Sequence, residues 1–143
     1  MLKVPDVNVL VSAVHAQAPG HRRARAWVED SFSGPHTVGL AWLALIGFIR
    51  ISTRRGIFED PLPVESALAV VHAWLAQPNA TVLAPGERHA ALLSSLLMGA
   101  GTAGNLTNDA HLAALALEHG ATLASFDRDF QRFAGLRHEA LTP

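Results

Sequence analysis

Residues 107–130 read TNDAHLAALALEHGATLASFDRDF and decide the fold class. The part 109–119 predicts a strong helix, and Gly120 suits the left-handed residue that closes a helix. The part 121–126 predicts a short apolar strand that runs directly into Asp127. A helix followed at once by a short buried strand is typical of α/β proteins.

The rest of the chain continues this alternation of helices with short apolar strands. We therefore expect an α/β fold, a three-layer sandwich in which helices flank a short, mostly parallel central sheet. The length of 143 residues fits a single domain over 1–143. The expected strands are 3–7, 36–40, 81–84, 121–126 and an edge strand at 137–141, and the expected helices are 21–32, 41–53, 63–76, 85–98 and 109–119, with 8–16 as a helix or a turn.

Composition excludes several classes of protein. Half of the residues are hydrophobic and 16% are charged, which argues against disorder. The absence of cysteine excludes a disulfide framework, a zinc ribbon and a thiol nucleophile. The N-terminus does not resemble a secretory signal, and the longest apolar stretch, 38–49, is too short to span a bilayer. A soluble, cytoplasmic protein without a membrane partner is expected.

Three of the twelve acidic residues stand out by position. Asp6 and Asp127 each follow a predicted strand, and Asp109 opens a predicted helix after a glycine-rich turn. Ligands of parallel sheets bind at the carboxyl ends of the strands, so these side chains are expected to meet there. Converging carboxylates repel one another unless they share a cation, and an all-aspartate set suits Mg²⁺ or Mn²⁺. Such a site supports metal-assisted hydrolysis of a phosphodiester.

Simpler roles are available for each of these residues taken alone. Asp6 can start a turn, and Asp109 and Asp127 can each cap a helix. The eight histidines show no zinc-binding spacing, and we interpret them as surface or boundary residues. Trp27, Trp42 and Trp74 each lie on an apolar helical face, which favours a place in the core.

Arginine supplies ten of the eleven basic residues and forms two clusters. The usual interpretation of such a cluster is a solvated helix face. Arginine also binds phosphate through two parallel hydrogen bonds, so a basic rim around an acidic pocket would bring RNA to the aspartates. The first cluster is Arg22, Arg23 and Arg25, and the second, our candidate for contacts with an RNA backbone, is Arg50, Arg54 and Arg55.

Three segments resemble motifs of the PIN-domain nucleases. Residues 4–10, VPDVNVL, are similar to the family's opening D-x-N-x-L motif. Residues 107–116, TNDAHLAALA, are similar to its D-A-x-x-A-A-x-A helix, and ASFDRDF at 124–130, followed by Gly135 and Leu136, is similar to its closing S-x-D-x-D-F…G-L segment. The order of the motifs and the length of the chain are typical of VapC toxins from bacterial toxin–antitoxin pairs.

The resemblance implies a PIN-like fold and an Mg²⁺-dependent endoribonuclease that a VapB-type antitoxin neutralises. It also implies a homodimer. Asp6, Asp109 and Asp127 match the catalytic, metal-binding acids, and Asp129 is a further candidate acid. Asn8 and Ser125 match polar positions that support the site.

One departure bears on activity. The family usually carries a glutamate in an E-x-x-R stretch, and the corresponding residues here are Gly47-Phe48-Ile49-Arg50. The glycine leaves room for water, a second ion or a backbone approach, or it weakens metal binding. A PIN-like module that binds RNA or a partner without cutting is therefore the alternative. A phosphorylated receiver domain would need a lysine near its acidic pocket. It is disfavoured here because the only lysine, Lys3, lies at the N-terminus.

Overall fold

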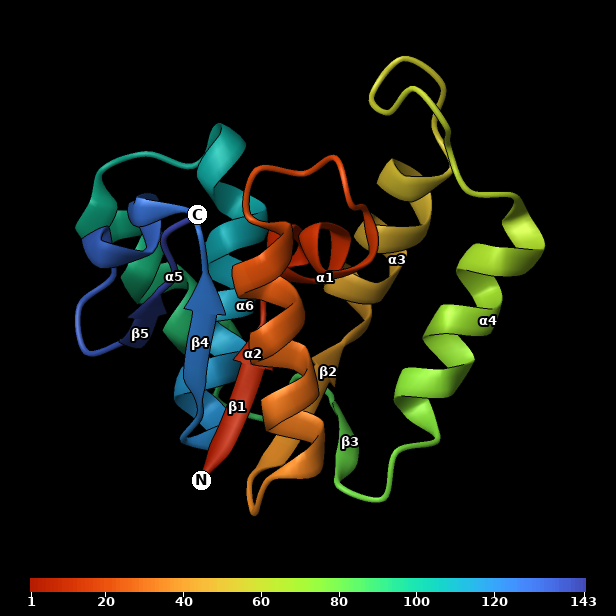
Figure 1. Ribbon diagram of the computed structural model, residues 1–143. Helices are drawn as coiled ribbons and strands as arrows, with labels where there is room; N and C mark the ends of the chain where they lie inside the picture. Colours follow the sequence, from red (N-terminus) through yellow and green to blue (C-terminus); the bar gives the residue numbers. More distant parts are fainter.

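The computed structural model describes residues 1–143, in which helices and strands alternate along the whole chain (Figure 1). Two short 3-10 helices, Gly104–Leu106 and Arg128–Arg132, complete the set. The order of the main elements is β1 (Leu2–Pro5), α1 (Val7–Val14), α2 (His21–Ser33), β2 (Thr37–Ala41), α3 (Trp42–Ser52), α4 (Val64–Leu75), β3 (Ala80–Leu83), α5 (His89–Ala100), α6 (Thr107–His119), β4 (Thr122–Ser125) and β5 (Arg137–Ala140).

The five strands form one sheet in the order β3-β2-β1-β4-β5, and every neighbouring pair is parallel. Lys3 of β1 is in register with Val38 of β2 on one side and with Thr122 of β4 on the other. The chain builds outward from β1 to β3 and then crosses back to place β4 on the other side of β1. The carboxyl ends of all five strands consequently lie at the same edge of the sheet, the upper edge in Figure 1.

Successive side chains of a strand point to opposite faces of the sheet. Apolar side chains therefore project from both faces, and helices cover both. Val4 and Leu123 pack with α5 and α6 in one hydrophobic cluster. Val38 and Leu40 pack with α1, α3 and α4 on the other face, and Ala124 packs with α1 and α2 beside them. The expected three-layer α/β sandwich is confirmed, with a sheet that is wholly rather than mostly parallel.

Two element boundaries differ from expectation in ways that affect the acidic residues. The first strand ends at Pro5 rather than at residue 7, because the Asp6 carboxylate accepts from the backbone N–H of Val7 and starts α1. Helix α6 begins at Thr107, which places Asp109 inside its first turn instead of at its opening. Gly120 ends α6 with φ +67°, as its position predicted.

Two expectations about burial were wrong. Trp42 is 48% exposed, because α3 buries the face that carries Ala44, Leu45 and Phe48. An almost entirely apolar helix gives no periodic signal from which to choose that face. His15 is buried rather than at the surface or boundary, and its ring stacks on Phe58 at 3.8 Å between centroids.

No helix in the structure is both long and apolar enough to cross a lipid bilayer.

The fully buried Leu115 of α6 provides a test of this packing. Leu115→Ala should lower the free energy of unfolding by about 2–5 kcal/mol, because it leaves a cavity in the layer under β1 and β4. Met98→Ala, at an 82% exposed position of α5, should change it by less than about 0.5 kcal/mol. Urea denaturation followed by circular dichroism measures both, and equal effects would contradict the described packing.

Candidate active site

The candidate site lies at the carboxyl edge of the sheet, between β1 and β4. The direction in which strands are added changes there. The chain runs from β1 to β2 on one side of β1, and it later returns to add β4 on the other side. Clefts at such reversals are the usual ligand sites of parallel sheets. The backbone N–H of Asp6 donates to the carbonyl oxygen of Ala124 at 2.9 Å, which joins the two strand ends.

Asp6 is held by a hydrogen bond to each carboxylate oxygen. Its Oδ1 accepts from the backbone N–H of Val7 at 2.7 Å, and its Oδ2 accepts from the Ser125 hydroxyl at 2.7 Å. The residue is only 6% exposed. Burial raises the pKa of the Asp6 carboxyl above its ordinary value, against the lowering effect of the two hydrogen bonds.

Ser125 and Asn8 join the two strand ends into one polar network. Ser125 Oγ accepts from the backbone N–H of Asp127 at 2.9 Å and from Asn8 Nδ2 at 3.2 Å. The Asn8 Oδ1 accepts from the backbone N–H of Phe126 at 3.2 Å. These bonds fix the carboxylate of Asp6 and the chain that leads into Asp127, so both residues lie where the sequence pattern placed them.

Three other aspartates form a compact acidic cluster beside Asp6. Each of Asp109, Asp127 and Asp129 contributes one carboxylate oxygen to a set whose members lie within 4.8 Å of one another. Asp127 also accepts from the backbone N–H of Asp129 at 2.9 Å, which starts the 3-10 helix Arg128–Arg132. The capping role expected for Asp127 therefore coexists with a place in the cluster.

The electrostatics of Asp109 reflect this crowding. Burial, followed by the negative charges of the three other aspartates, raises the pKa of Asp109 to about 6. At neutral pH the carboxylates repel one another, and no lysine or arginine forms an ion pair with them. The cluster offers only hard oxygen donors, a set that fits Mg²⁺ or Mn²⁺.

Asp6 and Asp109 also line a small cavity of about 70 Å³. Arg50 and Asn108 contribute to its wall, and no motif or spacing in the sequence had singled out Asn108. Asp6 is not in the 4.8 Å set, so the acids form two overlapping groups that share Asp109. A small cavity lined by carboxylates, an amide and a guanidinium suits a phosphate group and its counter-cation.

Gly47 lies in the wall of the same cavity. A Cβ atom built on Gly47 would approach Cγ2 of Val7 to 2.7 Å, a separation that requires the valine to move. Val7 therefore occupies part of the space that a side chain at position 47 would need. Where the family usually has a glutamate, this chain has Gly47, and the side chain of Val7 occupies the space beside it.

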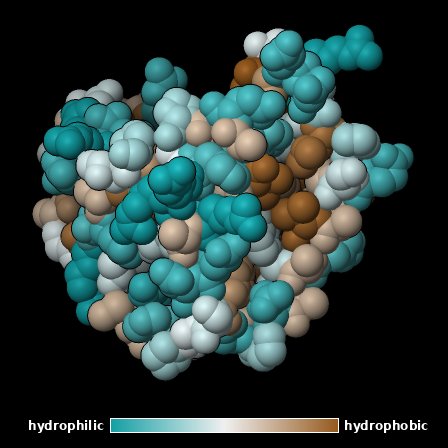
Figure 2. Space-filling model, in the orientation of Figure 1, coloured by the Kyte–Doolittle hydropathy of each residue, from teal (hydrophilic) through white to brown (hydrophobic).

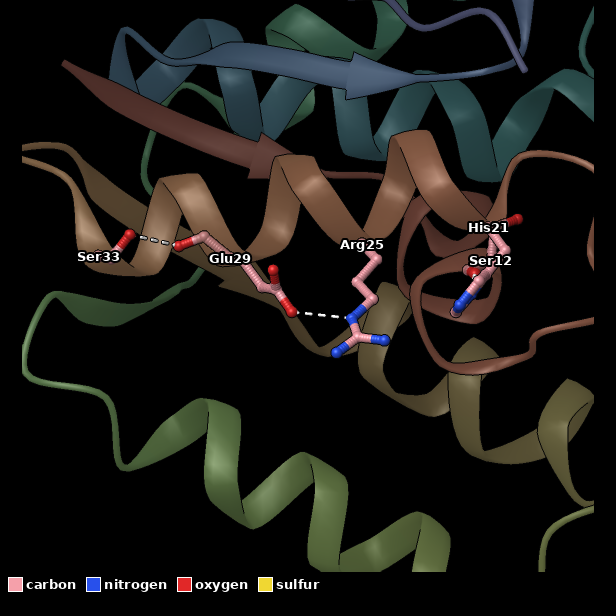
Figure 3. Close-up of polar contacts among 5 residues, drawn as sticks. All are labelled: Ser12, His21, Arg25, Glu29 and Ser33. Atoms are coloured by element: carbon pink, nitrogen blue, oxygen red, sulfur yellow. Dashed lines mark hydrogen bonds and ion pairs between the residues drawn. The ribbon is translucent and has the colours of Figure 1, made fainter.

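The two arginine clusters differ in their surroundings. In the first, Arg25 pairs with Glu29 at 2.8 Å along α2 (Figure 3), and Arg23 lies 3.7 Å from Glu139. In the second, Arg50 lines the acidic cavity, and Arg54 and Arg55 are exposed without an acidic partner. The second cluster is the one available to an anionic ligand near the acids.

Sequence comparison relates the chain to a family of known proteins. A model of the PIN domain matches residues 3–136. Ribonuclease VapC37 of Mycobacterium tuberculosis is 46% identical over 136 residues, which cover 95% of this chain and 94% of that protein. Ribonuclease VapC25 of the same organism is 42% identical over 139 residues, which cover 93% of this chain and 94% of that protein.

Solved structures agree on the fold. A chain of VapBC2 from Rickettsia felis, bound to a DNA fragment from its promoter, superposes with a TM-score of 0.68 at 17% identity, covering 99% of this chain and all of that one. A chain of VapBC-1 from nontypeable Haemophilus influenzae gives a TM-score of 0.68 at 19% identity, covering 98% of each chain. From the family model and the extent of these identities, we conclude that the chain belongs to the PIN domain family, among its VapC-type members.

Proposed function

We propose that this protein is a metal-dependent endoribonuclease, a hydrolase that acts as the toxin of a toxin–antitoxin pair. The acidic cluster of Asp109, Asp127 and Asp129 beside the buried Asp6 is the observation that carries the proposal. Relatives at 42–46% identity are named ribonucleases, which supports RNA as the substrate.

Mg²⁺ is the proposed cofactor, and Mn²⁺ would fit the same oxygen ligands. Asp6, Asp109 and Asp127 would hold it, with Asp129 as a further ligand. When bound, the ion would neutralise charge on the phosphodiester and make a nearby water more acidic.

The protein's own groups have separate tasks in this proposal. Ser125 and Asn8 hold Asp6 and the backbone at Asp127 in fixed positions, so that little reorganisation is needed when substrate binds. Arg50 lines the small cavity together with the aspartates and would orient the phosphate that is cut. Arg54 and Arg55 would bind neighbouring phosphates, which adds affinity without reading sequence.

The proposed partners follow from the same comparisons. Solved structures with this fold include VapBC2 and VapBC-1, so we propose that a VapB-type antitoxin binds this chain and blocks its activity. We further propose that the protein acts as a homodimer in the cytoplasm. Size-exclusion chromatography with light scattering tests the dimer.

The first prediction concerns Asp6. Asp6→Asn should lower the rate of RNA cleavage at least about a hundredfold, because metal-centred stabilisation is worth several kcal/mol and each 1.4 kcal/mol is tenfold. The fold should persist, because the Ser125 hydroxyl can redirect its hydrogen to Asn8 Oδ1 at 3.4 Å. Cleavage of single-stranded RNA in defined Mg²⁺ measures the effect. Full activity of the variant would contradict the assignment, and Mg²⁺-independent binding without cutting by the wild type would favour the non-catalytic alternative.

The second prediction concerns pH. The raised pKa of Asp109 means that the folded, metal-free protein holds this proton more tightly than the unfolded chain does. The contribution of protonated Asp109 to the free energy of unfolding is fully present below 3.8, the pKa of this group in the unfolded chain. It is lost as the pH rises through about 6, its pKa in the folded protein. Asp109→Asn should therefore stabilise the metal-free protein at pH 8 by about 1–2 kcal/mol, less than the ~3 kcal/mol of the whole shift because the group is half exposed.

Thermal unfolding between pH 4 and pH 8 checks this prediction. The difference in Tm between Asp109→Asn and wild type should shrink toward zero at pH 4. Mg²⁺ at pH 8 should raise the Tm of the wild type more than that of the variant, since the ion relieves the same repulsion. A variant less stable than the wild type at pH 8 would show that Asp109 is not under electrostatic strain.

The third prediction separates the arginines. Arg50→Ala should lower kcat at saturating RNA, because Arg50 shares the cavity with Asp6 and Asp109. Arg54→Ala should instead raise KM and reduce the slope of log affinity against log salt by about 0.7, because one side chain that binds a phosphate of single-stranded RNA has been removed. Steady-state cleavage over a range of salt concentrations distinguishes the two effects, and identical profiles would contradict the separate roles proposed for Arg50 and Arg54.

A further inference from the structure

A second, larger cavity lies next to the acidic site. Its volume is about 540 Å³, within the range of sites that bind small ligands. Val7 and Val11 of α1 form one wall, and Ile51, Ile57 and Phe58 from the end of α3 and the following loop form another. In Figure 2, apolar side chains gather on the surface over α3 and the region between α3 and α4 of Figure 1, to one side of α1.

The two cavities share a wall. Val7 lines both of them, and Asn8 lines the larger one while its side chain bonds to Ser125 in the network that holds Asp6. A ligand in the larger cavity would thus lie one side chain away from the acidic site.

The lining of the larger cavity selects against negatively charged ligands. No lysine, arginine or histidine lines it, and its one charged group is the carboxylate of Glu59. A phosphate group would meet no positive charge there. Ser12 and Gln17 add neutral donors and acceptors to a mostly apolar wall, which is the surface that an uncharged heterocycle needs.

Phe58 supplies a flat aromatic surface. Its ring stacks on His15, with the planes 3° apart and the centroids 3.8 Å apart, and His15 is buried. One face of the Phe58 ring is covered by the imidazole, and Phe58 also lines the cavity. Unstacked nucleobases bind on aromatic faces held in this way.

The wall around Ser12 is fixed before any ligand binds. The ring of His21 bonds through Nδ1 to the carbonyl oxygen of Ser12 at 2.8 Å, which ties α2 to α1 (Figure 3). The backbone N–H groups of Ala18 and His21 donate to the carbonyl oxygens of His15 and Ala18. A cavity formed in advance lowers the cost of ordering a ligand in it.

The surrounding charge favours RNA as the occupant. Arg54 and Arg55 lie in the chain between Ile51 and Ile57 of the cavity wall, are exposed and have no acidic partner. Arg50 precedes them and lines the acidic site. Positive charge therefore borders a cavity that carries none itself, an arrangement that complements a phosphate backbone carrying uncharged bases.

We propose that the larger cavity is a base-binding subsite, which receives one unstacked nucleobase of single-stranded RNA next to the phosphate that is cut. This inference rests on the proposed ribonuclease activity and adds a source of base preference to it. Phe58 stacks on the base, and Ser12, Gln17 and Glu59 face its polar edge.

The test uses a pool of short random-sequence, single-stranded RNAs. The wild type cuts the pool in Mg²⁺, and sequencing of the new ends gives the base preference on each side of the cut. We expect one flanking position to show a clear preference. Phe58→Ala should flatten it and lower kcat/KM for the preferred sequence by about tenfold, since the stacking of one base is lost.

Three further variants keep the test independent of folding. Phe58→Leu retains an apolar side chain but lacks the aromatic face, and Ile57→Ala trims a 46% exposed side chain in the cavity wall. Both should weaken the preference while the circular dichroism spectrum stays that of the wild type. Ile46→Ala is the matched control, because this 57% exposed isoleucine of α3 lines neither cavity.

The outcomes are distinguishable. A wild type that cuts no RNA would overturn the proposed function. A wild type that cuts RNA, with cavity variants whose rate and base preference match those of Ile46→Ala, would overturn the subsite alone. Unchanged cutting by cavity variants that no longer bind a VapB-type antitoxin would also overturn it, by assigning the cavity to a protein partner.

Discussion

The repulsion among carboxylates at the carboxyl edge between β1 and β4 is the constraint on which the rest of this site depends. Parallel pairing of β1 with β4 places the ends that carry Asp6 and Asp127 side by side, and α6 delivers Asp109 to the same edge. Hydrophobic clusters on both faces of the sheet hold these elements, and with them the backbone positions that carry Asp6, Asp109 and Asp127. The raised pKa of Asp109, about 6, reflects its burial first and then the negative charges of these neighbouring carboxylates.

Much of this arrangement could be predicted from the sequence, because it depends on topology rather than on detail. An aspartate that directly follows a buried parallel strand must lie at the carboxyl edge, and this placed Asp6 and Asp127 correctly. The alternation of helices with short apolar strands indicated the three layers. The start of α6 was harder to predict from the sequence. Thr107, Asn108 and Asp109 are all good helix-starting residues, and tertiary contacts determine which of them begins the helix.

Features that depend on a contact between distant residues could not be predicted in this way. The exposure of Trp42 follows from which face of α3 meets the sheet, and an apolar helix leaves that choice open. The consequence of Gly47 depends on Val7, forty residues away in the sequence, whose side chain occupies the space beside it. Restoring a glutamate at position 47 is therefore not a simple addition of a ligand, because a half-buried valine must be displaced first.

The two neighbouring cavities differ in chemistry, and we propose that the acidic one binds the phosphate while the larger one binds a base. Every nucleotide presents the same phosphate, so a site built from Asp6, Asp109 and Arg50 has little with which to distinguish one sequence from another. Discrimination requires contact with a base, and bases are uncharged and largely apolar on their faces. A cavity with a mostly apolar lining and an aromatic wall, joined to the acidic site through Val7, has the complementary chemistry. Under the proposed roles, cleavage chemistry and base preference would vary separately, because Ile57 and Phe58 line the larger cavity and not the acidic one.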